Sequence, residues 1–273
     1  MKRLVAVAGL VAVMCGSVRS TAQAARSAAS QSPGAPPKVV LLVHQHFLPG
    51  KAGERERLEV ETCRKFEEFG IPIAWIELEA VSGSPGALFF DPANSFKEID
   101  RAGQLLGEMY GAHPELVQLQ NEIEDRIASS KTVFARLRED LGHVDRVDLS
   151  KAHYWRVTTV SVRPGREGDF AEADKARGRV HPDAAWVVYE VDSGTAVPTF
   201  LVIETMSSLA DVDKTSETAS NSKQGQKERD QAVRDAYLSV ESDLYAVHPE
   251  MSHVPHTFAA SEPEFWTPSG VKR

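Results

Sequence analysis

Two histidines separated by one residue are the groups in this sequence best placed to do chemistry. His44 and His46 lie in the run of residues 39–48, where side-chain alternation puts both imidazoles on one face of a β-strand. Glu77 lies in a second run with strand character, at residues 73–80. An imidazole beside a carboxylate can transfer protons near neutral pH. We therefore predict His44, His46 and Glu77 as catalytic residues.

The same three side chains allow two other interpretations. Two histidines and one carboxylate are a ligand set for non-haem iron and related metals. Polar residues on a buried sheet face can also hydrogen-bond one another or buried water and do no chemistry. The residue types leave these alternatives open, and we predict no metal or other cofactor.

Several catalytic motifs are absent from the sequence. It contains no glycine-rich nucleotide loop, no Gly-x-Ser-x-Gly elbow, no His-Glu-x-x-His and no Cys-x-x-Cys. The histidines at positions 113, 181 and 248 each precede a proline and are interpreted as turn residues, and His253 and His256 as surface groups of the C-terminal region.

The first 24 residues have the layout of a secretory signal peptide. Lys2 and Arg3 precede an apolar run at residues 4–18, and small residues before Ala25 suit cleavage after Ala24. The apolar run is short of the roughly 20 residues that a membrane-spanning helix needs. We therefore expect a periplasmic or secreted protein without stable membrane insertion.

The net charge argues against one class of partner, and the cysteine count argues against a disulfide. The chain has 31 Lys+Arg against 39 Asp+Glu, and removing residues 1–24 would change its formal net charge from −8 to −11. Such an acidic protein is not expected to bind nucleic acid, because the phosphate backbone would repel it. Cys63 would remain as the only cysteine, so no intramolecular disulfide is expected and a hydrophobic core must supply the stability.

Five short stretches of the chain recur in the same order. The pattern Pro-Gly-basic-x-Gly-acidic occurs at residues 49–54 and 164–169, and Trp75 with Ser82-Gly83 corresponds to Trp186 with Ser193-Gly194. Further matches link residues 88–90 with 200–202, 96–100 with 209–213, and 139–144 with 249–254. We infer two copies of one unit, at residues 38–145 and 152–258, after a signal peptide (1–24) and an unstructured lead-in (25–37) and before a tail (259–273).

Each copy is predicted to follow the order β-α-β-β-α-β. In the first copy we expect a strand at residues 39–48, a helix from residue 54, a hairpin at 73–90, a helical region from 95 to 127 broken at His113-Pro114, and a strand at 132–137. The second copy follows the same path, with its second helix after Ser207 and its closing strand near residues 244–247. This order is that of the ferredoxin-like unit, so the predicted fold class is α+β with two tandem ferredoxin-like repeats.

A strand ending in x-Pro-Gly-Lys/Arg, followed by helix, hairpin, helix and strand, resembles the dimeric α/β-barrel superfamily. That superfamily includes the antibiotic-biosynthesis-type monooxygenases and NIPSNAP-like proteins, and its members range from oxygenases to haem enzymes. The resemblance implies that two antiparallel sheets pack into one barrel. A tandem chain would close the barrel as a monomer, or pair as a homodimer.

Strand parity then predicts a binding face between the two sheets. His44 and His46 should point into this space together with Thr159 and Ser161 of the second copy. We place Trp75, Glu77, Glu79, Trp186 and Glu190 there as well, with Ile76, Leu78, Val187, Tyr189 and Val191 under the helices. The predicted substrate-binding residues are Trp75, Glu79, Trp186, Glu190, Thr159 and Ser161.

A concave, partly aromatic face with a few polar groups is typical of a small-molecule site. We therefore expect an exported protein that binds a small apolar or aromatic molecule, as a cofactor-independent monooxygenase or another proton-transfer enzyme. A non-catalytic binding or scaffold protein of the cell envelope is the first alternative, and a metal or haem carrier the second.

Overall fold

A computed structural model describes residues 33–213 and 235–267 of the 273-residue chain. The first copy comprises β1 (Val39–Phe47), α2 (Ala52–Glu68), β2 (Ile76–Ala80), β3 (Gly86–Ala93), α3 (Phe96–Ala112), α4 (Pro114–Glu124) and β4 (Ile127–Leu137). The second comprises β5 (Tyr154–Val162), α5 (Glu167–Val180), β6 (Trp186–Ser193), β7 (Thr199–Met206) and β8 (Tyr237–Val247). Most of the predicted second helix of this copy, the signal peptide and most of the lead-in lie outside the described residues.

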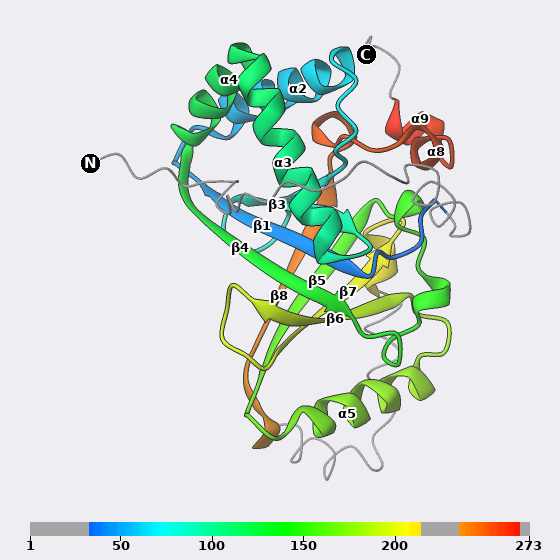
Figure 1. The fold of residues 1–273 in the computed structure, drawn as a ribbon. Coiled ribbons are helices and arrows are strands. Elements are labelled where there is room, and N and C mark those ends of the chain that lie inside the picture. Colours follow the sequence, from blue (N-terminus) through cyan, green and yellow to red (C-terminus); the bar gives the residue numbers. More distant parts are fainter. Residues whose placement is uncertain (1–32, 214–234, 268–273) are drawn as a thin grey trace, which may run out of the picture.

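The eight strands form one closed antiparallel barrel in the order β1-β3-β2-β8-β5-β7-β6-β4 (Figure 1). Each copy contributes a four-stranded sheet, and the two sheets join where β4 pairs with β6 and β2 pairs with β8. The predicted fold of two tandem ferredoxin-like repeats is confirmed. Both halves of the barrel come from a single chain.

Local sequence explains how the helices begin. Gly50 and Gly165 occupy the same place in the repeated Pro-Gly turn and both have a positive φ, 75° and 84°, a conformation that glycine adopts without strain. The Ser95 side chain accepts a hydrogen bond from the Glu98 amide at the start of α3, and Pro114 provides a new first turn for α4. The closing strand β4 starts at Ile127, five residues before the predicted residue 132.

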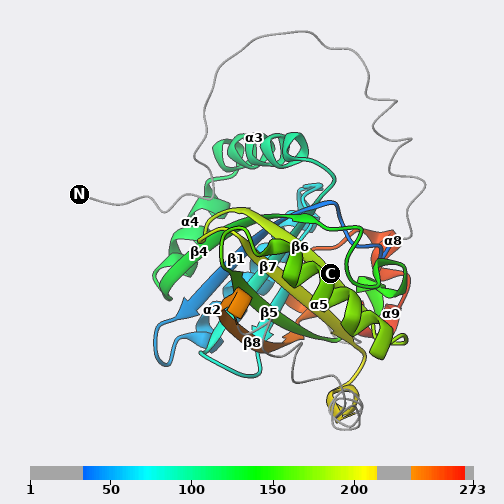
Figure 2. The same ribbon diagram turned by 90° about the horizontal axis from the view of Figure 1, so that it is seen from below.

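Three apolar clusters fill the molecule. The largest lies inside the barrel and draws residues from both copies, including Leu42, Leu78, Trp155 and Tyr189. A second lies between the first sheet and helices α2 and α4, and the third between the second sheet and α5 (Figures 1 and 2). The sheet is therefore buried on both faces over much of its area.

One end of the barrel is closed by segments outside the two repeats. The helical turns η2 (Val144–Arg146) and η3 (Leu149–Lys151) connect the copies, and η4 (Pro249–Met251), α8 (His256–Ala259) and α9 (Pro263–Trp266) follow β8. Val147 and Leu149 of the connection, and Phe258 and Trp266 of the C-terminal part, belong to the same apolar cluster as the barrel interior. We call this the closed end.

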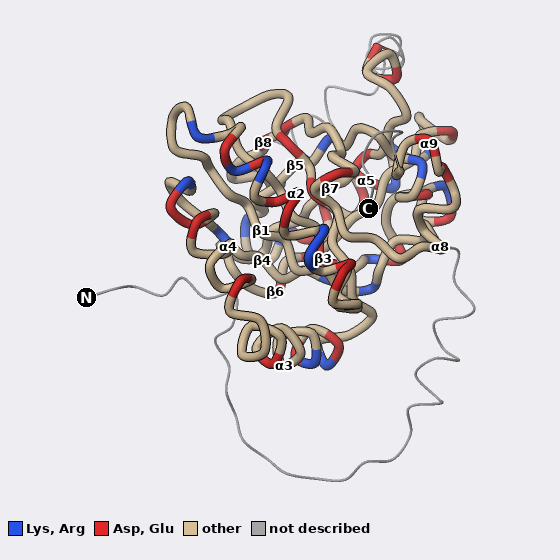
Figure 3. The backbone as a smooth tube through the Cα atoms, turned by 90° about the horizontal axis from the view of Figure 1, so that it is seen from above, with Lys and Arg blue, Asp and Glu red and all other residues tan. Residues whose placement is uncertain are grey.

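Charged residues of both signs are interspersed along the helices and loops (Figure 3). Many of them form short-range pairs, such as Lys65 with Glu68 at 3.0 Å. Within residues 33–213 and 235–267, no helix combines the length and the apolar character needed to cross a membrane.

Candidate functional site

His44 and His46 lie on the inward face of β1, in line with Val40 and Leu42 of the barrel core. His44 is directly opposite Lys131 of β4 on one side and Leu88 of β3 on the other. His46 is opposite Ser129 of β4. The strand alternation therefore predicted the direction of both imidazoles, and their role in chemistry stays a prediction.

The second copy presents hydroxyl groups at the equivalent positions. Thr159 and Ser161 share the inward face of β5 with Trp155 and Val157. The Ser161 hydroxyl lies 3.1 Å from the Thr199 hydroxyl, which itself donates to the Ala196 carbonyl at 2.6 Å. The Thr199 hydroxyl proton is donated to Ala196, so Thr199 can only accept from Ser161. Ser161 is therefore the donor in this pair, and its oxygen can still accept a hydrogen bond from another group.

The barrel interior changes from apolar to polar along its axis. Near the closed end Leu42, Leu78 and Trp155 have no exposed surface, so that part of the interior is filled by side chains. At the other end the inward-facing residues are polar and several are exposed. We define the polar end by His44, His46, Ser129, Lys131, Thr159, Ser161, Ser239 and Glu241.

Strand pairing keeps the polar end accessible. β6 pairs with β4 only from Phe134 onward, and β2 pairs with β8 only from Tyr245 onward. The preceding parts of β4 and β8 are therefore paired on one side only, and they carry Lys131 and Glu241. Both of these side chains are exposed.

His44 is electrostatically unusual among the groups of the polar end. Burial, the Lys131 ammonium and the neighbouring His46 together lower the pKa of His44 from its ordinary value of 6.5 to about 4. The imidazole is therefore neutral near physiological pH and is a weaker base than an ordinary histidine. The Lys131 ammonium on the neighbouring strand donates a hydrogen bond to the Thr195 hydroxyl at 3.1 Å.

The prediction that Glu77 joins the histidines is wrong. Glu77 points to the opposite face of the sheet, where its carboxylate lies 3.0 Å from the Arg55 guanidinium of α2. Arg55 also lies 3.3 Å from Glu59. Burial raises the pKa of Glu77 to about 8, against the opposing effect of Arg55. A metal site made from His44, His46 and Glu77 is excluded by this arrangement.

Trp75 and Trp186 also lie on the face opposite to the one predicted. The Trp75 indole lies beneath α2 and donates to the Met251 carbonyl at 2.8 Å, while Trp186 lies beneath α5 and donates to Asp174 at 2.8 Å. Glu79 and Glu190 share that outer face, 3.3 Å from His248 and 2.9 Å from Arg138 respectively.

The physical reason is the packing of the barrel interior. Its core takes the residues that were predicted to lie under the helices: Ile76, Leu78, Val187, Tyr189 and Val191. The indole N–H groups and the Glu77 carboxylate instead find polar partners on or near the helices. Within the described ranges no group of three or more His, Cys, Asp or Glu side chains is arranged to hold a metal ion.

Sequence reasoning missed Lys131 and Glu241. Lys131 precedes residue 132, where the closing strand was predicted to start, and Glu241 lies in the half of β8 that precedes the predicted strand near residues 244–247. Longer closing strands would have placed both opposite predicted site residues, Lys131 beside His44 and Glu241 beside Thr159.

Comparison with known proteins supports the fold. No family model matches the sequence, and no curated protein matches it. Among solved structures, a candidate monooxygenase from Fusobacterium nucleatum is similar at 10% identity and a TM-score of 0.52, covering 78% of this chain and 93% of that one. An anthrone oxidase-like protein is similar at 14% identity and a TM-score of 0.51, with 77% and 91% covered. Together with the strand order, these likenesses show that the chain has the ferredoxin-like dimeric α/β-barrel fold, with both halves of the barrel in one polypeptide.

Proposed function

We propose that the protein binds a small organic molecule at the polar end of the barrel and acts on it as a proton-transfer enzyme of the cofactor-independent monooxygenase type. The observation that carries the proposal is the position of His44. It faces inward, it is neutral near physiological pH, and it lies opposite the positive charge of Lys131.

These two residues can divide one chemical step between them. The His44 imidazole can accept a proton from a phenol or from carbon next to a carbonyl group, because the substrate anion that forms beside it counteracts the Lys131 charge that lowers its pKa. The Lys131 ammonium stabilises the same anion. Such an anion can give electrons to dioxygen without a bound cofactor. With anthrone as substrate the balance is one anthrone and one dioxygen giving one anthraquinone and one water, and His44 returns its proton to the reduced oxygen.

The surroundings suit a substrate that is apolar at one end. Leu88 lies opposite His44 on β3, and Leu201 lies opposite Thr159 on β7, so apolar side chains flank the polar ones. Thr159 can donate a hydrogen bond to an oxygen of the substrate, and Ser161, whose proton goes to Thr199, can accept one from a substrate hydroxyl group. His46 lies two residues farther along β1. The named neighbours, a candidate monooxygenase and an anthrone oxidase-like protein, favour the same chemistry.

Oxygen uptake with anthrone as the probe tests the proposal. The wild-type protein should accelerate uptake above the uncatalysed rate, and His44→Gln should lower kcat/KM by about 100-fold or more, the usual contribution of a general base. Lys131→Met should lower it as well. Ser130→Ala provides a matched control, because Ser130 neighbours Lys131 on β4 and points to the opposite face.

Measuring anthrone binding together with oxygen uptake distinguishes an enzyme from a protein that only binds the molecule. If anthrone binds with an affinity that His44→Gln weakens but no oxygen is consumed, the protein is a binding module of the same site. If His44→Gln and Lys131→Met both leave uptake and binding at wild-type values, the polar end has no role in either.

We further propose that the protein is exported and that its mature form begins at Ala25. The pattern of residues 1–24 supports this. The intact mass of protein purified from an extracytoplasmic fraction tests it, and a full-length cytoplasmic product would contradict it.

A further inference from the structure

Asp91 of β3 is a carboxylate without a partner on the outer face of the first sheet. Within residues 33–213 and 235–267, its side chain forms no hydrogen bond and no ion pair. Burial alone raises the pKa of Asp91 to about 7, and no charged group in this part of the chain lies close enough to oppose the effect. The side chain is half-buried rather than fully buried, so solvent still reaches it.

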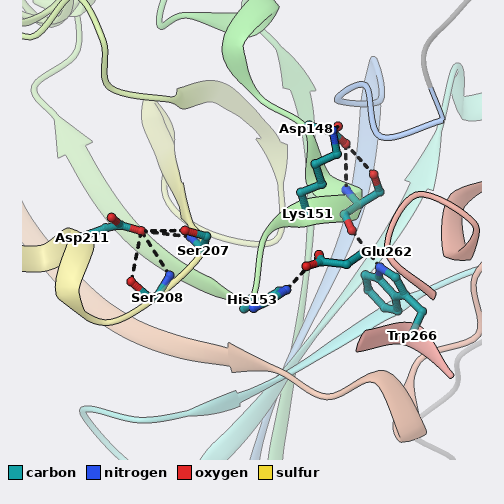
Figure 4. A network of polar contacts seen from close by, with 9 residues as sticks. Asp148, Lys151, His153, Ser207, Ser208, Asp211, Glu262 and Trp266 are labelled. Atoms are coloured by element: carbon teal, nitrogen blue, oxygen red, sulfur yellow. Dashed lines mark hydrogen bonds and ion pairs between the residues drawn. The ribbon is translucent and has the colours of Figure 1, made fainter. Parts of the chain in front are cut away.

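Several other carboxylates of the protein have partners close by. Asp148 accepts a hydrogen bond from the Ser150 hydroxyl at 2.6 Å. Glu262 lies 2.9 Å from the His153 imidazole (Figure 4). A carboxylate that is partly removed from water normally has a cation or a hydrogen-bond donor beside it, because an unpaired buried charge is costly. The isolation of Asp91 therefore needs a physical explanation.

The second copy has a carboxylate at the equivalent position. Alignment of residue 44 with residue 159, the inward-facing positions of β1 and β5, places Leu41 on Arg156. Asp91 lies directly opposite Leu41 on β3, and Glu204 lies directly opposite Arg156 on β7. Asp91 and Glu204 therefore occupy the same position of the repeated unit.

Two arginines neutralise this carboxylate in the second copy. The Arg156 guanidinium lies 2.8 Å from Glu204, and Arg177 of α5 forms a second ion pair with it. The Arg177 guanidinium also lies over the Trp186 ring, 4.5 Å from the ring centroid. With these partners Glu204 is buried, at 7% exposure. The second copy thus shows what the position accepts, which is a guanidinium held by a carboxylate and an aromatic ring.

The first copy keeps the carboxylate and lacks both arginines. Leu41 stands at the place of the first arginine, and alignment of the two Pro-Gly motifs puts Thr62 of α2 at the place of the second. The Thr62 hydroxyl donates to a backbone carbonyl of its own helix at 2.9 Å. Arg136 of β4, on the same face of the sheet, is paired with Asp192 at 2.8 Å. The described part of this copy therefore offers no cation to Asp91.

Apolar side chains surround the approach to Asp91. Leu41 lies between Asp91 on β3 and Phe134 on β4. The Phe134 ring lies 5.9 Å from the Phe96 ring at the start of α3. None of the 17 residues of α3 is buried, Leu41 and Phe134 are only half-buried, and Figure 2 shows this helix set apart from the strands. The side chains of α3 therefore leave this part of the sheet accessible to a small molecule with an apolar body.

We propose that Asp91 binds a small organic cation, an alkylguanidinium or alkylammonium group, which takes the place of the arginine pair of the second copy. The cationic group donates charge-assisted hydrogen bonds to the carboxylate, and its alkyl chain lies against Leu41 and Phe134. Binding requires the ionised form of Asp91, so the cation competes with a proton for the same group. The site lies on the outer face of the first sheet and is separate from the polar end of the barrel.

Titration calorimetry with n-butylguanidinium chloride as the probe tests the site. The wild type should bind it saturably and about 30-fold more tightly at about pH 8 than at about pH 5.5, the ratio of ionised Asp91 for a pKa of about 7. The uncharged n-butylurea should bind at least ~10-fold more weakly at the higher pH. Asp91→Asn should weaken binding of the cation by ~10-fold or more. Asp100→Asn is the matched control, because it removes an exposed carboxylate of α3 that already accepts from Gln104.

Leu41→Arg tests the comparison between the two copies. It keeps Asp91 and supplies the arginine that the second copy has at this position, so the affinity for n-butylguanidinium should fall by ~10-fold or more. The site is overturned if the wild type shows no saturable binding at about pH 8, if n-butylurea binds equally well, or if either folded variant binds the cation as the wild type does. If Asp91→Asn does not fold, Leu41→Arg and the two probes still decide.

Discussion

Arg55 of α2 lies 3.0 Å from Glu77 of β2, and both side chains are buried, at 1% and 0% exposure. Glu59 completes the cluster at 3.3 Å from the same guanidinium. Two carboxyl groups therefore share one buried cation. Burial raises the pKa of both, to about 8 for Glu77. The cluster joins the first helix to its sheet and explains why Glu77 is not part of the polar end.

The cluster predicts a large loss of stability when its cation is removed and a small one when a carboxyl group is replaced. Arg55→Met leaves two buried carboxyl groups without a cation and should lower the free energy of unfolding by about 3–5 kcal/mol. Glu77→Gln keeps the shape and removes an ionisable group, so the cost at neutral pH should be small. Chemical denaturation measures both, with Arg64→Met as an exposed control expected within about 0.5 kcal/mol of wild type.

The effect of Glu77→Gln on the free energy of unfolding should depend on pH. The pKa of Glu77 is raised in the folded state, so folding favours the protonated form, and wild-type stability falls as the pH rises from the unfolded value of 4.5 toward about 8. The Glu77→Gln variant should lack the fall in stability that ionisation of Glu77 causes. If the difference between wild type and variant is the same at pH 5 and pH 9, Glu77 does not titrate as inferred.

Much of the fold could be predicted from the sequence, because turns and repeats are local signals. The Pro-Gly turns, the break at His113-Pro114 and the duplicated order of the strands all correspond to observed features. Hydrophobicity alone could not predict which side chains of β2 and β6 point into the barrel and which point toward the helices. Both faces of this sheet are buried, and the choice between them depends on distant partners such as Arg55 for Glu77 and Met251 for Trp75.

The low pKa of His44 gives a prediction that does not depend on any substrate. Its NMR titration should have a midpoint near 4, and Lys131→Met should raise that midpoint because one of the charges that disfavour the imidazolium is gone. A midpoint near the ordinary value of 6.5 in both proteins would contradict the burial and charge arrangement described for the polar end.

The same shift affects stability in acid. Because the pKa of His44 is lowered on folding, the unfolded state binds the proton more tightly, and stability falls as the pH drops from 6.5 toward about 4. His44→Gln should flatten this decline. Urea denaturation at several pH values measures it, and an unchanged slope in the variant would show that other groups cause the acid sensitivity.

Alanine substitutions at two glycines with nearly the same φ can distinguish the cost of backbone strain from the cost of a steric clash. Gly142 has a φ of 74° and Gly50 a φ of 75°. A Cβ on Gly142 would lie 2.6 Å from the Trp186 carbonyl oxygen, whereas one on Gly50 would meet no heavy atom within 4 Å. Gly50→Ala should therefore cost only the left-handed conformation, about 1–2 kcal/mol. Gly142→Ala should cost at least about 2 kcal/mol more, and equal losses of unfolding free energy in the two variants would contradict the close approach.

Closure of the barrel within one chain predicts the oligomeric state. Every strand has a neighbour on both sides from the same polypeptide, and the joins β4–β6 and β2–β8 replace those that a dimer would supply. The folded protein should remain monomeric over about a hundredfold range of concentration in analytical ultracentrifugation, and its thermal midpoint should not depend on concentration. A dimer that loses its secondary structure on dilution would instead mean that the joins form between chains. Since the polar end draws on both repeats, His44 and Lys131 from the first and Thr159 and Ser161 from the second, a monomer would also place one complete polar end in each polypeptide.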